Sequence, residues 1–469
     1  MRILFLSSVF TLLFNAFATA QAPVFKAGAF AMDITPLDLP ISINGNMKDF
    51  KATTVHDKIY ARCIVLDDSR TKLAIVVCDS CMIPREVFDD AKKTVAETIG
   101  IPAVNILCSA THTHSAPTAT GVFQSEPEKD YPNFLSKKIA GGIIEAHRRL
   151  IPAKIGWGIA TDPTQVFNRR WLIKPGQMNI NPFGETTDKV IMNPGYMNMR
   201  VDKSAGPTDP EVSVLSLVSK EDKPIALLAN YSLHYVGGFP AISADYFGAF
   251  AEQIGVLLNA DKSFVGIMSN GTSGDVNNVN FGGMAPGKRL PGEQIRIVAD
   301  SVAKTALKAV KNIKYKQHIS LASEQKELSL GVRLPTTAEL AKANEIIVKA
   351  NKTVLDTQAE IYARETVLIA KYPANVPVII QAMRIGELGI CAIPCEVFTE
   401  IGLELKKKSP LKQTFTISLA NGYNGYLPTF EQHKLGGYET WRARSSYLET
   451  KASVKVTSAL FELLGNVAK

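Results

Sequence analysis

The chain has 469 residues, of which 46% are hydrophobic and 20% charged. This balance is typical of a globular protein with a large core, and it excludes a disordered, collagen-like or low-complexity chain. The formal net charge of +8 is mild for the length, and the densest basic cluster, residues 406–408, is typical of a solvated helix end. We therefore expect no nucleic-acid partner.

The first twenty residues have the pattern of a secretory signal peptide. Arg2 precedes a mostly apolar stretch at 3–17, and Ala18-Thr19-Ala20 is a small-residue cleavage site. An N-terminal anchor would need a longer apolar run, and no later run reaches membrane length. We predict a signal peptide over residues 1–20, an exported (periplasmic or secreted) protein and no transmembrane segment in the mature chain. The oligomeric state is not indicated.

Apolar runs and amphipathic stretches alternate along the rest of the chain. No internal repeat or linker interrupts residues 21–469, so we predict an α/β fold: a single large mixed α/β domain. The stretch 161–207 is rich in Asn, Pro, Gly and Met, and we expect a long irregular insertion there. The expected strands are 60–66, 73–78, 104–108, 154–159, 212–218, 225–233, 264–268, 319–330, 376–385, 388–393 and 415–419. The expected helices are 84–99, 134–150, 246–258, 292–313, 337–370 (one or two helices), 396–407 and 446–464.

The six cysteines are too few for a disulfide scaffold of this size. Most of them lie in or beside apolar strands, so we expect buried small hydrophobic residues, or one or two disulfides whose pairing the sequence leaves open. They are Cys63, Cys78, Cys81, Cys108, Cys391 and Cys395.

Residues of metal-ligand type follow four of the expected strands. His112 and His114 come after the strand that ends near 108, and His234 comes after 225–233. Glu396 follows 388–393 at the start of an expected helix, and Tyr426 follows 415–419. In α/β sheets ligands gather at the carboxyl ends of strands, so these side chains predict one common site.

His112 and His114 stand two residues apart. In an extended segment both would point to one face, about 6–7 Å apart, which suits two ligands of one ion, or one ligand and one acid–base residue. Two His and one Glu are a common catalytic zinc set that leaves a position for water, whose pKa the zinc lowers to about 7. Tyr426 is a less common candidate for a fourth zinc ligand.

Several segments resemble the neutral/alkaline (non-lysosomal) ceramidases. The segment Thr111-His112-Thr113-His114-Ser115-Ala116-Pro117 is similar to the T-H-T-H-S-G-P segment of that family. Further similar segments follow in the family's order over the mature chain. They are Asp33-Ile34-Thr35-Pro36, Asn168-Arg169, Ile393-Pro394-Cys395-Glu396, and the stretch from Asn421 to Tyr438 with its two tyrosines, Tyr426 and Tyr438.

The resemblance implies an exported, zinc-dependent hydrolase that cleaves a small-molecule or lipid-like N-acyl amide into a carboxylate and an amine. It implies that His114 lies near the reacting carbonyl and that Arg169 and Tyr438 bind or polarise the amide. The zinc ligands that it implies are His112, His234, Glu396 and Tyr426.

The sequence departs from the family in two respects. Asn277 stands where the family carries a serine in a Gly-rich segment, and Ser273 is the nearest stand-in. The chain also stops soon after the second tyrosine, so we expect no C-terminal β-sandwich module. Two alternatives remain open on the same site: a zinc hydrolase of an ester, lactone or acylated sugar, and a non-catalytic binding protein. The second alternative predicts a lost ligand, yet all four are present.

Overall fold

The computed structural model describes residues 24–237 and 239–469. The predicted signal peptide, residues 1–20, lies outside this part of the chain. Among the described residues, no helix has the length and apolar character needed to cross a membrane.

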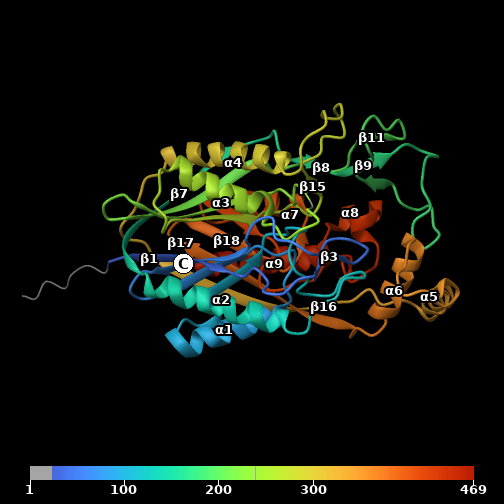
Figure 1. The fold of residues 1–469 in the computed structure, drawn as a ribbon, viewed down its shortest axis with the longest axis horizontal. Helices are drawn as coiled ribbons and strands as arrows, with labels where there is room; N and C mark the ends of the chain where they lie inside the picture. Colours follow the sequence, from blue (N-terminus) through green and yellow to red (C-terminus); the bar gives the residue numbers. More distant parts are fainter. Residues whose placement is uncertain (1–23, 238) are drawn as a thin grey trace, which may run out of the picture.

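A mixed sheet of eight strands forms the centre of the molecule (Figure 1). Both of its edge strands, β6 and β14, run parallel to their inner neighbours, whereas the inner pairs are antiparallel. In spatial order the strands are β14 (Val265–Asn270), β13 (Pro224–Tyr231), β12 (Glu211–Ser219), β7 (Ile151–Thr161), β1 (Lys26–Asp33), β4 (Tyr60–Asp67), β5 (Lys72–Cys78) and β6 (Ile106–Ala110).

The inner strands β4 and β5 are covered on both faces, which explains why their sequences read as continuous apolar runs rather than alternating ones. In β4, Cys63 and Val65 face a core shared with helices α1 (Arg85–Ile99) and α2 (Tyr131–Arg148). The alternate residues Ile64 and Leu66 face a second core on the other side of the sheet.

A second sheet of four strands packs on that other face. Its residues Ile390 and Phe415 share one hydrophobic core with Ile64 and Leu66. Its own outer face packs against α7 (Thr399–Lys408) and α9 (Ala452–Val467). In spatial order its strands are β16 (Leu321–Gly331), β17 (Asn375–Ile385), β18 (Leu388–Ala392) and β20 (Gln413–Ile417).

The molecule is thus a four-layer α/β/β/α sandwich. Helices α3 (Asp245–Leu257) and α4 (Glu293–Lys311) cover the β12–β14 half of the large sheet, and α1 and α2 cover the β4–β6 half (Figure 1). Helices α5 (Thr337–Ala350) and α6 (Gln358–Ile369) pack on each other at one end. This architecture confirms the predicted mixed α/β fold.

Short elements surround one end of the two sheets. The stretch 161–207, expected to be irregular, contains β8, β9, β10 and β11, three of which form a small sheet, because its backbone polar groups find partners within the insertion. The short elements are β2 (Ile41–Ile43), β3 (Phe50–Ala52), η1 (Ala103–Asn105), β8 (Phe167–Asn168), β9 (Arg170–Ile173), β10 (Val190–Met192), β11 (Val201–Ser204), β15 (Val276–Asn277), β19 (Glu396–Val397), β21 (Tyr426–Leu427), α8 (Phe430–Leu435) and η2 (Tyr438–Thr440).

Three further expectations need correction. The helix predicted from residue 396 begins only at Thr399, and Glu396 lies on the short strand β19 instead. The closing helix begins at Ala452 rather than at 446. All six cysteines are buried and free, so they act as small hydrophobic residues and the disulfide alternative is wrong for this structure.

Candidate metal centre

The strand ends that carry the predicted ligands are hydrogen-bonded to one another. At the end of β6, the N–H of Ala110 donates to the carbonyl of Leu419 at 3.1 Å, beyond the end of β20. The Asn270 side chain, at the end of β14, donates to the Thr111 carbonyl at 3.0 Å. Leu419 N–H in turn donates to Cys395 O at 3.0 Å. The end of the large sheet and the end of the small sheet therefore form one rigid floor.

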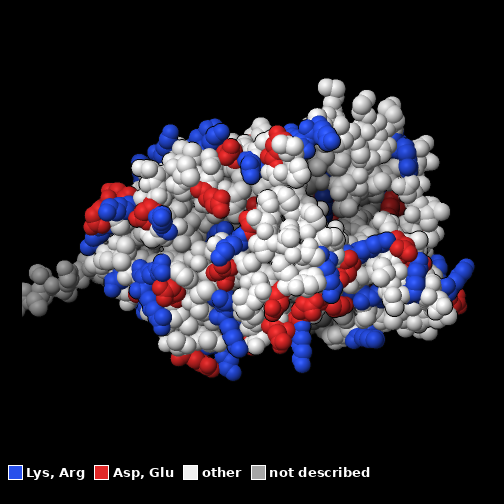
Figure 2. All heavy atoms as spheres, in the orientation of Figure 1, with Lys and Arg blue, Asp and Glu red and all other residues white. Residues whose placement is uncertain are grey.

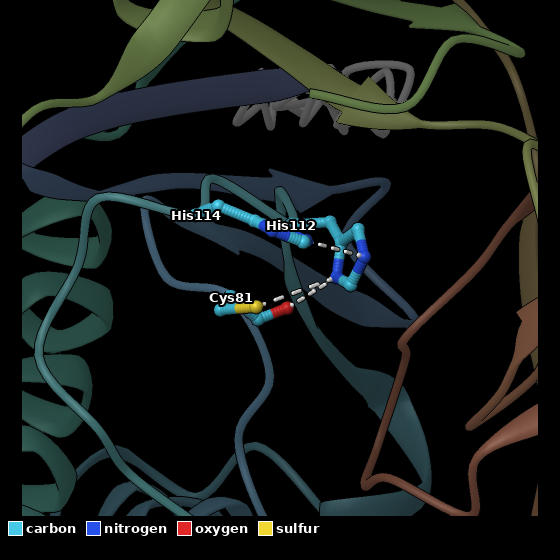
Figure 3. Close-up of side chains that lie close together, drawn as sticks. All are labelled: Cys81, His112 and His114. Atoms are coloured by element: carbon cyan, nitrogen blue, oxygen red, sulfur yellow. Dashed lines mark hydrogen bonds between the residues drawn. The ribbon is translucent and has the colours of Figure 1, made fainter. Parts of the chain in front are cut away.

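His112 turns sharply at this floor. Its φ is +76°, a left-handed conformation that is uncommon for a residue with a Cβ. The segment is therefore not extended, and the expected separation of 6–7 Å is wrong. The turn brings Nε2 of His114 to 3.2 Å from Nε2 of His112. Figure 3 shows the His112 ring in contact with Cys81 through one ring nitrogen and with His114 through the other.

Backbone carbonyls orient two of the imidazoles. Nδ1 of His112 lies 2.9 Å from the Cys81 carbonyl oxygen, and Nδ1 of His234 lies 3.1 Å from the Ser273 carbonyl oxygen. A carbonyl can only accept, so each Nδ1 carries the proton and each Nε2 keeps its lone pair. This is the usual arrangement of a metal-binding histidine.

Glu396 meets these two lone pairs. Its Oε1 accepts a hydrogen bond from the Tyr423 hydroxyl at 3.0 Å. Its Oε2 is buried without a hydrogen-bond partner among the described residues, and it lies 3.3 Å from Nε2 of His112 and 3.8 Å from Nε2 of His234. Tyr423 thus leaves one carboxylate oxygen free to bind a cation.

Three acceptor atoms therefore converge in a buried space, since the two Nε2 atoms are themselves 3.0 Å apart. Lone pairs repel at this distance unless a cation or a proton lies between them. The imidazole and carboxylate donors, all buried, fit a zinc ion. Cys81 and His114 form a second group with His112, but Cys81 Sγ lies 3.7 Å from the Nδ1 side of that ring, away from the Nε2 atoms.

The charge balance of the cluster supports this interpretation. Burial works to lower the pKa of His112, but the neighbouring Cys81 and Glu396 outweigh it and raise that pKa well above its ordinary value. Burial and the positive charge of Arg169 and His112 hold the pKa of His234 well below its ordinary value. Burial raises the pKa of Glu396, but His112, Tyr426 and Arg169 together outweigh it and hold that pKa below its ordinary value. The cluster of His112, His234 and Glu396 therefore favours one positive charge, a proton or a cation, between its acceptor atoms.

Tyr426 stands beside Glu396. The strands β19 and β21 run parallel, with Glu396 and Tyr426 as direct partners, so the two side chains project from neighbouring positions. The Tyr426 hydroxyl accepts a hydrogen bond from Nη2 of Arg169 at 3.0 Å. A phenolic oxygen held in this way presents its remaining lone pair elsewhere, which suits a fourth ligand.

A buried ion-pair network fixes Arg169. Glu439 is fully buried and bridges two guanidinium groups: Oε1 lies 3.0 Å from Nε of Arg169, and Oε2 lies 2.6 Å from Nη1 of Arg170. The Gly274 carbonyl accepts a further hydrogen bond from Nη2 of Arg169 at 2.9 Å. Arg169 therefore holds both the Tyr426 hydroxyl and the backbone at Gly274 in place by hydrogen bonds.

His114 and Tyr438 line a narrow cavity above the centre. The cavity measures about 20 Å³ and is also lined by His112, Glu396 and Tyr426. That is room for about one water molecule. The Nδ1 of His114 has no hydrogen-bond partner among the described residues, and its ring stacks on Tyr235 at 3.6 Å. His114 thus presents a ring nitrogen that no described residue occupies.

Asn277 is not brought to this cavity. It lies on β15, and its side-chain amide donates to Asn193 at 2.8 Å, in the insertion. Ser273 is buried, and its hydroxyl donates to Oδ1 of Asn270 at 2.7 Å, so its backbone carbonyl rather than its hydroxyl serves the centre, through His234.

Two residues of the centre, Tyr423 and Glu439, were not indicated by the sequence. Tyr423 lies three residues before Tyr426 in the same Gly- and Asn-rich segment, and Glu439 follows Tyr438 directly. The two successive arginines, Arg169 and Arg170, could have suggested that a buried acid pairs with them. A single sequence does not show that the segment of Glu439 meets theirs.

The chain is thus a four-layer α/β/β/α sandwich with a buried His–His–Glu cluster at its strand ends, which makes it a candidate metal-binding protein. Comparison with known proteins identifies the fold. The crystal structure of neutral ceramidase from Pseudomonas aeruginosa superposes with a TM-score of 0.72 at 17% identity, over 96% of this chain and 75% of that chain. A second solved structure, a ceramidase complexed with C2, gives a TM-score of 0.69 at 16% identity, over 95% of this chain and 75% of that one.

Among curated proteins, neutral ceramidase B of Dictyostelium discoideum is 24% identical over 221 residues. The aligned stretch is 45% of this chain and only 28% of the relative's length. No family model matches the chain. The chain thus has the fold of the neutral ceramidases, and the resemblance seen in its sequence is confirmed.

Proposed function

We propose that the protein is a zinc-dependent hydrolase that cleaves a lipid-like N-acyl amide into a carboxylate and an amine. The observation that carries this proposal is the convergence of two imidazole lone pairs and one free carboxylate oxygen beside a narrow cavity. The similarity to ceramidases supports the amide as the bond that is cleaved.

The ion would be held by His112, His234, Glu396 and Tyr426. Zinc supplies Lewis-acid chemistry: it polarises a carbonyl and lowers the pKa of water to about 7. His114 has an unpartnered ring nitrogen at the cavity wall, so it accepts the proton of the attacking water and returns it to the leaving amine.

Tyr438, which also lines the cavity, donates to the oxygen on which negative charge develops, and the buried positive charge of Arg169 strengthens the field there. The Asn277 side chain is hydrogen-bonded to Asn193 and not to any of these groups. We therefore assign it no acyl-enzyme step of the kind a serine would perform.

The decisive experiment is a hydrolysis screen with metal analysis of the same sample. Fatty N-acyl amides, matched esters and acylated sugars are offered to the wild type and to His234→Ala. We expect amide hydrolysis by the wild type, about one zinc per chain, and loss of both in the variant. Hydrolysis of esters or acylated sugars alone would assign the alternative substrate class, and full zinc occupancy in His234→Ala would overturn the ligand set.

Residues 21–469 would form the single catalytic domain of an exported protein. The charge at Arg2, the apolar stretch and the small residues that end at Ala20 support export. N-terminal sequencing of the mature protein should give Gln21 as its first residue, and a retained Met1 would contradict the proposal.

A further inference from the structure

Three loops at one end of the molecule carry apolar side chains that project into solvent. We call these loops, residues 174–189, 193–200 and 278–291, the rim. Five large apolar side chains of the rim are between 72% and 86% exposed, and it is their gathering on neighbouring loops that marks an interaction surface. They are Ile180, Met197, Met199, Met284 and Leu290.

The three loops are fastened to one another. The Asn277 side chain, just before the third loop, donates to Asn193 at 2.8 Å, and the rings of Tyr196 and Phe281 lie 5.5 Å apart. Nη2 of Arg200 donates to the Gln177 carbonyl at 2.6 Å, which joins the second loop to the first. The rim is therefore a connected surface rather than three independent loops.

The rim also borders the route to the metal centre. A cavity of about 560 Å³ is lined by Ile180 of the rim, by Ile191 and Met192 of the insertion, and by Tyr438. Tyr438 also lines the narrow cavity above His112 and Glu396. Tyr438 therefore lies between an open cavity at the rim, whose lining is both apolar and polar, and the proposed reaction site.

Positive charge accompanies these apolar tips. Residues 174–204 and 277–291 contain six Lys or Arg and three Asp or Glu, and the loop 278–291 has no acidic residue at all. In Figure 2 the end of the molecule that carries β9 and β11 shows few charged side chains, with basic ones at its margin. Projecting apolar tips with basic neighbours are the composition of a surface that lies on anionic lipid.

We propose that the rim docks the protein on an anionic lipid surface, from which an amphiphilic substrate passes into the 560 Å³ cavity and on toward Tyr438. The proposal rests on the proposed function in one respect only, since a lipid-like substrate is the reason for such a surface. Apolar tips that project from connected loops can enter the boundary between headgroups and acyl chains, whereas a protein partner would need a continuous packed face.

The test measures binding without hydrolysis. The full chain is sedimented with vesicles of phosphatidylcholine and phosphatidylserine, two to one, and with vesicles of phosphatidylcholine alone. We expect tight binding to the first and much weaker binding to the second, with the difference lost at high salt. The absence of binding to both vesicles would overturn the proposal.

Matched variants locate the surface. Met197→Ser/Met199→Ser/Met284→Ser should bind the mixed vesicles about tenfold or more weakly, because three apolar side chains no longer enter the lipid. The control is Val256→Ser/Val348→Ser/Val354→Ser, which changes three exposed apolar residues elsewhere and should bind like the wild type. Equal loss in both variants would overturn the rim assignment.

Two charge-reversal variants distinguish docking on lipid from docking on a protein partner. Lys203→Glu/Lys288→Glu should weaken binding to mixed vesicles at least about tenfold, whereas Lys304→Glu/Lys308→Glu on α4 should not. If the methionine variant instead dissolves a dimer in gel filtration and leaves vesicle binding unchanged, the rim joins two copies of the chain and the proposal is wrong. Failure of amide hydrolysis alongside intact vesicle binding would refute only the proposed reaction.

Discussion

Tyr423 determines which oxygen of Glu396 is free. Its hydroxyl occupies Oε1 at 3.0 Å, so Oε2 faces the two imidazoles. We expect Tyr423→Phe to fold normally and to bind zinc about 10–100-fold more weakly, the usual effect of losing a residue that orients a ligand. Competition with a chromogenic chelator measures this affinity. Tyr372→Phe, which alters a phenol remote from the centre, is the control, and equal affinities in wild type and Tyr423→Phe would contradict the orienting role.

His114 and Ser273 distinguish two mechanisms. Direct attack by water needs a base at the cavity wall, so His114→Ala should lose about 10²-fold or more in kcat while keeping its zinc. Ser273→Ala should lose little, because the hydroxyl is committed to Asn270 and the centre uses only the Ser273 carbonyl. The two rate constants with metal content decide the matter. A dead Ser273→Ala beside a nearly intact His114→Ala would require a serine nucleophile.

Between elements, Glu439 forms a buried tie to two arginines. It joins η2, which carries Tyr438, to Arg169 and Arg170 at the start of β9. Removing one partner of a buried ion pair leaves an uncompensated charge, so Glu439→Ala should destabilise the fold by about 3–5 kcal/mol in denaturant unfolding. Glu439→Gln keeps the shape and one acceptor, so it should retain more stability but lose kcat as Arg169 shifts from Tyr426. Unchanged kcat in Glu439→Gln would show that the tie serves stability alone.

At the same scale, the sequence identifies elements far better than it identifies how they meet. The apolar runs of β4, β5, β12 and β13 and the amphipathic α1 and α4 were predictable because an apolar run and a helical period are both local signals. Two packed sheets were not, since a strand buried on both faces looks the same whatever covers it. The strand β19 was mistaken for a helix start because two residues of parallel pairing to β21 leave no periodic signal.

The same contrast holds at the centre. His112, His114, His234, Glu396, Tyr426 and Tyr438 could be selected from their places after apolar strands and from the family resemblance. Their geometry could not, because it depends on the left-handed turn at His112 and on carbonyls from Cys81 and Ser273. Backbone carbonyls carry no signature in a sequence.

For the whole molecule, the acceptor cluster predicts that metal and fold are coupled. A ligand that binds only the folded chain raises stability in proportion to the logarithm of its concentration. The Tm of the chelator-treated protein should therefore rise as zinc is added, by a few degrees once zinc is in large excess over its Kd. The same titration should leave His112→Ala and His234→Ala unmoved, and an equal upward shift in these variants would contradict the site.

The pH dependence of stability offers a second test at this scale. Burial, with help from Arg333 and Arg170, lowers the pKa of His433 from 6.5 to about 3. The unfolded chain takes up this proton near pH 6.5 and the folded chain only near pH 3, so stability is lost as pH falls through this window. Denaturant unfolding of the metal-free protein across the window should show a shallower fall for His433→Asn than for wild type. Identical slopes would contradict the prediction.

At His112 the residue that the backbone conformation favours differs from the residue that metal binding requires. For a residue with a Cβ this conformation costs about 1–2 kcal/mol, and glycine adopts it freely. His112→Gly should therefore be more stable than His112→Ala, although both lack the imidazole. The residue that best suits the backbone there is one that cannot bind metal, so stabilising substitutions chosen for the fold alone would erase the centre.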